Sequence, residues 1–433
     1  MNPQVVVGQS VAALAAVERL AANGEHVRWL VTGPVGESFA PKTVDGRHLG
    51  LGLRVMEHDD RVVGYLTDLL PDLRPLPTPQ ITLGERVVED FTLTGRLAAV
   101  ADLLDDRTLD RIAADLVQIR ETSSPAGVLD EPGPVGLTLL QASMGNHGEL
   151  FHRIVVDSIA SALVPGGAGA VEATQRHRIG APLYGPEVLL QAVTGGEPAC
   201  GSRRFLTDRH GGSSDIVTVL ERRIGQSPTV ERLDVGSIAA LANVGAHTEL
   251  AFDSGHVEHA LAPMLATPPS ESFAAARIPH HADRVAASFL WLDVEERDVV
   301  NPSPTTFLDD DLVFRVCAST PEPDAAGAMR RAFSVELRTG APPDARHAIR
   351  SLARAGLITD RARPSVLAHH RIPAFVVPSA ANRHGFEQAS SDLRDALPGT
   401  RLLGNLATYA ADGLNEQLIS GLAAAEEVCG AHV

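Results

Sequence analysis

The stretch that decides the fold is VVVGQSVAALAAVERLAANGEHVRWLVTG, residues 5–33. The apolar run at 5–7 is typical of a buried parallel strand, and Gly8 ends it. Apolar residues then recur at helical spacing over 11–20, and 26–31 is apolar enough for a second strand. This segment therefore predicts a strand, tight turn, helix and strand within about 30 residues, as a dinucleotide-binding unit requires.

The turn of this unit keeps only part of the glycine pattern G-x-G-x-x-G, because its three positions are Gly8, Ser10 and Ala13. Gly8 can make the tight turn and Ala13 is accepted where helix packs on strand, but Ser10 places a Cβ where the backbone should approach a pyrophosphate. Val31 and Thr32 stand where an acidic residue would bind the ribose, and losing that contact would weaken nucleotide binding by about ten- to a hundredfold. The unit predicts either a retained nucleotide or an inherited fold with an altered site.

Length and charge limit the classes of protein that the sequence can encode. A chain of 433 residues exceeds what one hydrophobic core usually organises, so two domains are expected. The formal charge of −17 argues against nucleic acid or an anionic membrane as the main partner. Lys42 is the only lysine among 37 basic residues, which makes Schiff-base chemistry improbable.

The cysteines and the N-terminus predict a cytoplasmic protein. Cys200, Cys317 and Cys429 have no C-x-x-C spacing, so neither a disulfide framework nor a zinc site is indicated. No basic N-terminal region and no run of about 18 apolar residues is visible. We therefore expect neither a secretory signal nor a membrane span.

The histidines and the acidic run do not predict a metal site. His147 and His152 are five residues apart and fall on different faces of a helix. The pairs at 280–281 and 369–370 stand in loop-like sequence, and we interpret them as solvated or structural histidines. The run 309–311, Asp-Asp-Asp, is interpreted as a solvated turn rather than a cation site.

The rest of the chain continues the α/β pattern. Proline clusters mark excursions from the core, and helical periodicity predicts helices over 93–120 and 150–163. Gly211-Gly212 precedes a capped helix, two short strands, a hairpin with its turn at 253–255, and an apolar strand ending in prolines. The stretches 286–316 and 333–337 are rich in strand residues, which predicts a sheet in a second domain. Residues 401–428 again read as strand, glycine turn and alanine-rich helix.

The order of these pieces resembles the FAD-dependent amine oxidase and protoporphyrinogen oxidase superfamily, including its UDP-galactopyranose mutase-like members. HRIGAPLYGPEVL (177–189) resembles the PLYxPE segment of mutase-like members, and DLVFRVCAST (311–320) and AFSVEL (332–337) resemble their substrate-domain strands. The resemblance covers nearly the whole chain. It implies an α/β fold with a Rossmann-like FAD-binding domain from 1–60, 195–275 and 398–433, and an inserted α+β substrate or cap domain from 61–194 and 276–397.

The resemblance also implies where FAD would be held. It places contacts at the pyrophosphate turn, at the glycine pair after the second strand, at the adenine, and at the last strand and helix. These positions are Gly8, Ser10, Ala13, Gly33, Gly36, Ile238, Gly404, Asn405, Leu414 and Asn415. The N-terminal dipole of the last helix would face the flavin or its phosphates. Ser10, Val31 and Asn405 depart from the family pattern at cofactor contacts.

Arginines and tyrosines are the candidates for binding a substrate. Arg176, Arg178 and Arg315 offer permanently charged donors with the fork geometry that suits an anionic substrate. Tyr184 and Tyr409 are two of only three tyrosines, and each is a candidate for the pocket, with core packing as the alternative.

Arg315 allows a more specific expectation. Strand alternation predicts Phe314 and Val316 on one face and Arg315 on the other, where it would point into a cleft between domains. The alternative is a salt bridge to an acidic neighbour such as Glu336 on an adjacent strand.

The predicted function is that of an FAD-dependent oxidoreductase acting on a small metabolite, with the flavin supplying the redox chemistry. One alternative is a mutase-like isomerase in which the arginines and tyrosines hold the diphosphate of a sugar nucleotide. Another is a non-catalytic protein that has kept the fold and lost FAD. No catalytic base is visible, and the partners considered are a small molecule and a second copy in a homodimer.

Overall fold

The parallel sheet at the centre of the fold joins segments that are far apart in the chain. The structure is a computed structural model that describes residues 3–40, 42–44, 47–52, 56–122, 134–198, 203–208, 214–324, 326–409 and 413–430. Within these ranges, the sheet has the strand order β10-β2-β1-β14-β21, with every neighbouring pair parallel. Its strands are β1 (Gln4–Gly8), β2 (Val27–Val31), β10 (Val230–Asp234), β14 (Met264–Ala266) and β21 (Arg401–Leu402). The predicted Rossmann-like fold, built from N-terminal, central and C-terminal segments, is confirmed.

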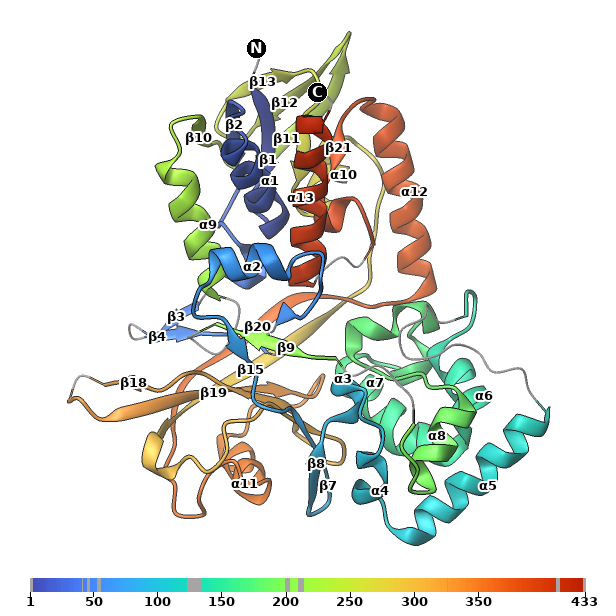
Figure 1. The fold of residues 1–433 in the computed structure, drawn as a ribbon. Helices are drawn as coiled ribbons and strands as arrows, with labels where there is room; N and C mark the ends of the chain where they lie inside the picture. The colour runs from blue at the N-terminus through green and yellow to red at the C-terminus, as the bar shows by residue number, and fades with distance from the viewer. Residues whose placement is uncertain are drawn as a thin grey trace.

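One face of this sheet is covered by α1 (Val11–Ala22), with α9 (Ser214–Gln226) and α13 (Leu414–Gly430) packed beside it (Figure 1). Val6 and Trp29 point toward these helices, and the three helices and the sheet share one apolar core. Most residues of α1 are buried. Its alanines are small enough to allow close contacts between helix and strand that larger side chains would prevent.

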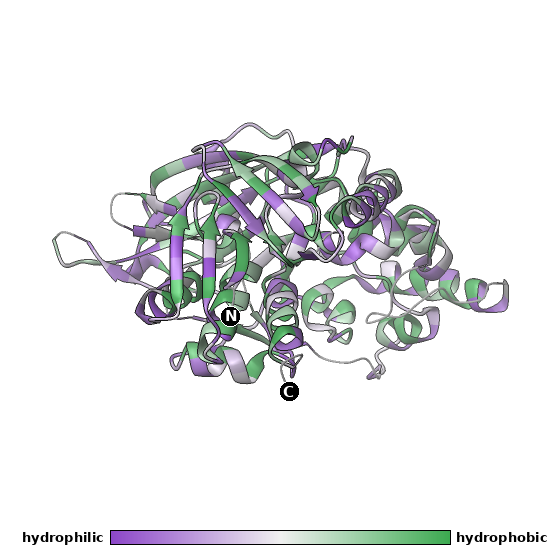
Figure 2. Cartoon of the chain, turned by 90° about the horizontal axis from the view of Figure 1, so that it is seen from above, coloured by the Kyte–Doolittle hydropathy of each residue, from purple (hydrophilic) through white to green (hydrophobic). Residues whose placement is uncertain are grey.

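The other face of the parallel sheet meets a second core. Val7 and Leu30, which alternate with Val6 and Trp29 along their strands, pack with Phe386 and Leu393 of α12 (Ala380–Ala396). An antiparallel sheet covers the same core, and it consists of β11 (Ile238–Val244), β12 (His247–Phe252) and β13 (Val257–Ala260). Buried residues alternate with more accessible ones along strand β12, and hydrophilic and hydrophobic positions likewise alternate along strands in Figure 2. The hairpin turn predicted at 253–255 joins β12 to β13.

A larger mixed sheet forms the predicted strand-rich part of the chain. Its main path runs β20-β15-β19-β17-β16-β7-β8, and β18 pairs with β19. These strands are β7 (Gln80–Leu83), β8 (Arg86–Glu89), β15 (Arg284–Glu295), β16 (Thr305–Phe307), β17 (Val313–Ala318), β18 (Glu322–Pro323), β19 (Met329–Leu337) and β20 (Ser365–Val376). The helix α11 (Ala345–Arg354) packs its apolar side against Leu292 and Phe333 of this sheet.

A layer of helices lies beside the larger sheet (Figure 1). It comprises α3 (Phe91–Thr94), α4 (Ala99–Leu103), α5 (Asp106–Thr122), α6 (Leu139–Phe151), α7 (Asp157–Leu163) and α8 (Pro186–Val193). The helix predicted over 93–120 is broken into three, because Gly95 adopts a left-handed conformation and ends α3, and Leu104 has an extended backbone and ends α4. The helix predicted over 150–163 is interrupted by a π-helical turn at His152–Val156.

The remaining elements connect these layers. The segment 33–57 contains the 3-10 turn Glu37–Phe39, the hairpin β3 (Lys42–Val44) and β4 (Arg47–Leu49), and β5 (Met56–Glu57). The strand β9 (Phe205–Thr207) pairs with β5 and with β6 (Arg74–Pro75), while α2 (Val63–Leu69) and α10 (Pro269–Ala275) lie near the parallel sheet. Gly211-Gly212 and Cys200 lie outside the described residues, and the domain boundaries stay predictions.

Two predictions about polar residues are wrong. The pair at 369–370 lies in strand β20, not in a loop. Asp310 is a buried carboxylate rather than part of a solvated turn. It accepts hydrogen bonds from the amides of Leu312 and Val313 and from the hydroxyl of Ser351, and it pairs with Arg354. Burial alone would raise the pKa of Asp310, but the hydrogen bonds from Ser351, Val313 and Leu312, with the charge of His347, hold it below its ordinary value.

The described part of the chain has neither a metal-binding cluster nor a membrane-spanning helix. It contains no group of three or more His, Cys, Asp or Glu side chains placed to share a metal ion. In the same residues, none of the helices has the length and apolar character needed to cross a bilayer.

Candidate functional site

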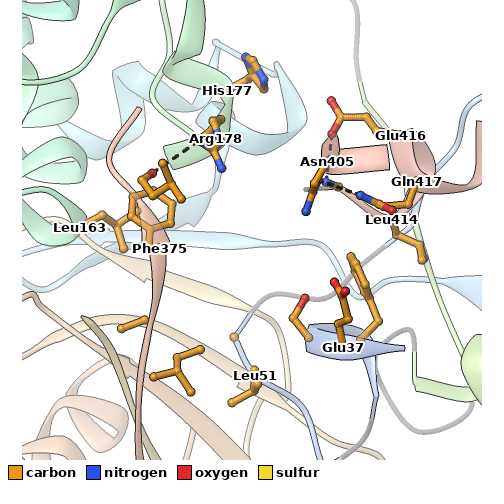
Figure 3. Close-up of a pocket in the computed structure, with 18 of the residues that line it drawn as sticks. Glu37, Leu51, Leu163, His177, Arg178, Phe375, Asn405, Leu414, Glu416 and Gln417 are labelled. Carbon is orange, nitrogen blue, oxygen red and sulfur yellow. Dashed lines mark hydrogen bonds between the residues drawn. The ribbon is translucent and has the colours of Figure 1, made fainter. Parts of the chain in front are cut away.

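A cavity of about 880 Å³ lies where the parallel sheet, the larger sheet and the helical layer meet. Figure 3 shows Glu37 entering it from the N-terminal segment, His177 and Arg178 from the helical layer, and Asn405 and Glu416 from the last segments of the chain. This is the region between layers in which a Rossmann-type protein holds its ligands.

The structure brings some of the predicted site residues together in this cavity and leaves others outside it. The predicted residues that line it are Ser10, Arg176, Arg178, Arg315, Asn405, Tyr409, Leu414 and Asn415. The predicted residues that do not line it are Gly8, Ala13, Gly33, Gly36, Tyr184, Ile238 and Gly404. Their assignment as cofactor or substrate contacts stays a prediction.

Gly8 is required by packing between strands. Its φ is +124°, and a Cβ there would lie 2.4 Å from the carbonyl oxygen of Ala266 on β14. Ser10, two residues later, caps α1, because its hydroxyl accepts a hydrogen bond of 3.3 Å from the amide of Ala13. The turn therefore keeps its glycine for a structural reason and uses one free amide of the helix to bind its own serine.

Internal hydrogen bonds also fill the edge of the sheet beyond this turn. Gln9 and Thr32 are both buried, and the Thr32 hydroxyl donates to Oε1 of Gln9. The backbone carbonyl of Gln9 accepts from the amide of Gly36 at 2.7 Å. A Cβ on Gly33 would lie 3.4 Å from the Gln9 amide nitrogen, so Gln9 also occupies the space beside Gly33.

Glu37 places a carboxyl group in the same region. Its φ is +48°, a left-handed conformation that costs a residue other than glycine about 1–2 kcal/mol. Its Oε1 is buried without a hydrogen-bond partner in the described structure. Burial, with a smaller contribution from Glu271, raises the pKa of Glu37 to about 7.

Ile238 at the start of β11 is the position that the resemblance assigns to the adenine. Its amide donates a hydrogen bond of 2.7 Å to Oε1 of Glu271, in the first turn of α10. The backbone donor at this position is therefore already satisfied by the protein.

The closing motif makes similar internal contacts. Asn405 accepts a hydrogen bond of 2.8 Å from Gln417, and Asn415 donates one of 2.7 Å to the carbonyl of Glu57. At the start of α13, Glu416 accepts from the amide of Gly413 at 3.0 Å. The N-terminus of α13 thus faces the cavity with a carboxylate of its own, which offsets the positive end of the helix dipole.

The opposite side of the cavity is basic. Arg176, His177 and Arg178 follow one another on the 3-10 helix Ala173–Ile179, and we call them, together with Arg315, the arginine wall. The guanidinium of Arg178 lies 5.3 Å from the ring centre of Tyr409, and the Tyr409 hydroxyl donates to the carbonyl of Val377 at 3.0 Å. Burial lowers the pKa of Arg178, and desolvation followed by the charge of Arg178 lowers the pKa of His177 to about 4. His177 is therefore neutral at pH 7, while the arginines keep their charge.

Arg315 reaches the cavity for a different reason from the one predicted. A β-bulge between Val313 and Arg315 breaks the alternation, so Phe314 packs into the helical layer while Val316 packs toward α11. The predicted common face for Phe314 and Val316 is therefore wrong.

The guanidinium of Arg315 lies close to the arginines of the helical layer. A Cβ on Gly180, which ends their 3-10 helix, would be 3.5 Å from Nη2 of Arg315. The Nε of Arg315 is buried without an acceptor, and no ion pair joins Arg315 to Glu336, although the two are paired in the strand register. The salt bridge considered as the alternative is absent from the structure.

Tyr184 packs in the core and does not line the cavity. Its side chain is buried, its hydroxyl donates to the carbonyl of Phe91 at 3.1 Å, and its amide donates to Nε2 of His147 at 2.7 Å. Burial lowers the pKa of His147 to about 3, which keeps this histidine neutral and structural. For Tyr184 the structure supports the core-packing alternative.

Sequence reasoning missed three residues that shape the site: Gln9, Glu37 and Glu271. Gln9 occupies the variable position inside the glycine pattern, and Glu271 lies in the first turn of a short helix, so neither carries a periodic signal. Glu37 could have been identified from the sequence, because an acidic residue directly after Gly36 places a charge at the turn where phosphates were expected.

Comparison with known proteins shows which fold this is. No family model and no curated protein sequence matches the chain. Among solved structures, reduced UDP-galactopyranose mutase has a TM-score of 0.74 at 14% identity, with 100% of this chain and 94% of that chain covered. An oxidoreductase from Methanosarcina mazei has a TM-score of 0.63 at 13% identity, with 98% of this chain and 100% of that chain covered. Putrescine oxidase bound to putrescine has a TM-score of 0.60 at 14% identity, with 99% of both chains covered.

The chain has the fold shared by UDP-galactopyranose mutase and putrescine oxidase. The fold implies FAD, but the residues at the positions that the resemblance assigns to its ADP part do not fit it. The amide of Ile238 is already bonded, Gln9 and Thr32 satisfy one another, and the carboxyl of Glu37 lies beside the turn where a diphosphate would bind. The cavity extends from these positions to the arginine wall.

Proposed function

We propose that the chain binds a small organic anion in the cavity and uses the amine oxidase-like fold without the ADP contacts of FAD. The observation that carries the proposal is the arginine wall. Arginine stays charged at all accessible pH values, and a cation in a partly desolvated wall is stabilised by an anion that binds directly opposite it. Arg315 has no ion pair with a described residue, which leaves its charge available to a ligand.

The geometry favours a carboxylate or phosphate group at this end. Guanidinium groups bind such groups through two parallel hydrogen bonds. The approach of Arg315 to Gly180 places its guanidinium beside the helix that carries Arg176 and Arg178. Phe375 and Tyr409 flank Arg178 and give the same end of the cavity apolar surface for the body of an organic ligand.

The FAD-dependent oxidoreductase is the second candidate. The cavity extends to Ser10 at the start of α1 and to Leu414 at the start of α13. The resemblance assigns both positions to the cofactor, which favours this candidate. The full-length similarity to an oxidoreductase and to putrescine oxidase supports the same candidate. A mutase-like isomerase would use the same cavity and would need a diphosphate at the arginine wall.

Titration calorimetry with succinate, inorganic phosphate and UDP tests the proposal. We expect saturable binding of at least one of these probes, and a loss of at least tenfold in affinity in Arg178→Gln. Arg107→Gln, an exposed change on α5, is the matched control and should bind as the wild type does. Binding by none of the probes, or an equal loss in both variants, would contradict the proposal. The visible absorption spectrum of the purified protein separates the candidates, because bound flavin supports the oxidoreductase and preferred binding of UDP supports the mutase-like isomerase.

A further inference from the structure

We infer that the chain closes the nucleotide end of its cavity with its own side chains, so that Glu37 and Glu271 exclude the ADP group of FAD. This end is defined by the carboxyl ends of β1 and β2 and by the start of α1, where a Rossmann-type sheet holds a diphosphate. The inference concerns the acidic end of the cavity and is independent of what binds at the arginine wall.

The first step concerns the diphosphate. A diphosphate at this turn needs free amides at the start of α1 and no negative charge nearby. Ser10 already caps one amide, and Glu37 lines the same cavity as Ser10. The hydrogen bond from the amide of Gly36 to the carbonyl of Gln9 holds the backbone before Glu37 against this turn, and Oε1 of Glu37 is buried there.

The backbone of Glu37 supports the same conclusion. A left-handed conformation favours glycine, and Gly36 beside it adopts one with φ +82°. A second glycine at position 37 would relieve the strain and would also leave the cavity open. The chain instead carries the larger, charged residue in a strained conformation, which is how side chains with a specific task are often found.

The second step concerns the ribose and the adenine. The Gln9 and Thr32 side chains bond one another and are buried, so the edge of β2 offers no carboxylate to ribose hydroxyls. At the start of β11, the amide of Ile238 donates its hydrogen bond to the carboxylate of Glu271. A purine ring nitrogen would otherwise be the acceptor of that bond. Each of the three parts of ADP therefore meets either a carboxyl group or groups that are already hydrogen-bonded within the protein.

Calorimetric titration with ADP and with FAD tests the inference on the full chain. We expect no saturable binding of FAD by the wild type, and no binding of ADP beyond what inorganic phosphate displaces from the arginine wall. Glu37→Gly with Glu271→Ala should gain ADP binding by at least tenfold, because these changes remove the carboxyl and free the Ile238 amide. Glu37→Gln keeps the side-chain volume and should show a smaller gain. Glu426→Gln, an exposed change on α13, should show none.

The outcomes are distinct. A wild type that purifies with FAD, or that binds FAD on titration, overturns the inference. Equal ADP affinity in the wild type, in Glu37→Gln and in the double variant also overturns it, and circular dichroism establishes which variants are folded. If the double variant does not fold, the gain in Glu37→Gln decides. Succinate binding by the wild type and by Arg178→Gln tests the arginine wall with Glu37 and Glu271 unchanged, so a failure of the anion proposal can be told apart from a failure here.

Discussion

The amide of Ile238 on β11 and the carboxylate of Glu271 on α10 form a hydrogen bond of 2.7 Å. It ties the antiparallel sheet to the helix that follows β14, and it occupies the backbone donor that the resemblance reserves for a cofactor. Burial raises the pKa of Glu271, while the bond to Ile238 opposes that shift. This contact satisfies the Ile238 amide within the protein itself.

Removing the acceptor should weaken folding. We expect Glu271→Ala to lower the free energy of unfolding by about 1–2 kcal/mol, because the Ile238 amide loses a charged partner and is left partly buried. Glu271→Gln keeps an acceptor oxygen and should cost less. Urea unfolding measures both, and a loss of stability in the glutamine variant as large as in the alanine variant would show that the charge, not the hydrogen bond, matters.

Glu37 should make stability depend on pH. Its pKa in the folded protein is about 7, above the ordinary value of 4.5, so the folded state holds this proton more tightly than the unfolded state does. Stability from this group is fully present below about pH 4.5 and is lost as pH rises toward 7. The difference in unfolding free energy between wild type and Glu37→Gln should therefore shift against the wild type between pH 5 and 7.5. A difference that does not change with pH would mean that Glu37 titrates normally.

The layers of this fold could be predicted from the sequence because they rest on periodic signals. Strands β1, β2, β10 and β14 and helices α1, α9 and α13 are apolar runs or amphipathic repeats ended by glycine, proline or a cap. The breaks were harder to predict. Gly95, the π-helical turn at His152–Val156 and the bulge before Arg315 change the local structure without changing the hydrophobic pattern around them.

The site could be predicted less well, since its decisive contacts are long-range and polar. Gly8 suggested a phosphate turn, yet its packing on Ala266 requires glycine whether or not a phosphate is present. Glu271 and Ile238 are 33 residues apart, and no local pattern links them. The arginines were identified by type, and only the structure shows that Arg178 and Arg315 share one cavity while Tyr184 does not.

The crossing of α13 over α1 depends on Gly421. A Cβ there would lie 2.2 Å from the carbonyl oxygen of Ala12, which is backbone and cannot move aside. We expect Gly421→Ala to lower the free energy of unfolding by about 1–3 kcal/mol through overpacking. Gly225→Ala on α9 is the matched control, because nothing lies within 4 Å of a Cβ there, and it should be neutral or stabilising. Equal unfolding free energies for the two variants would contradict the close contact between α1 and α13.

Arg315 gives the most direct test of the arginine wall. If its guanidinium binds the anion through two hydrogen bonds, Arg315→Lys should bind succinate or phosphate at least tenfold more weakly than the wild type does. The reason is that lysine keeps the charge but lacks the two parallel donors of the guanidinium. If the charge alone mattered, or if Arg315 served a pair with Glu336, the lysine variant would bind nearly as well as the wild type. Arg315→Gln, which removes the charge, should bind no better than the lysine variant. Calorimetry at low and at moderate salt measures these affinities, and an affinity of Arg315→Lys equal to that of the wild type would remove Arg315 from the site.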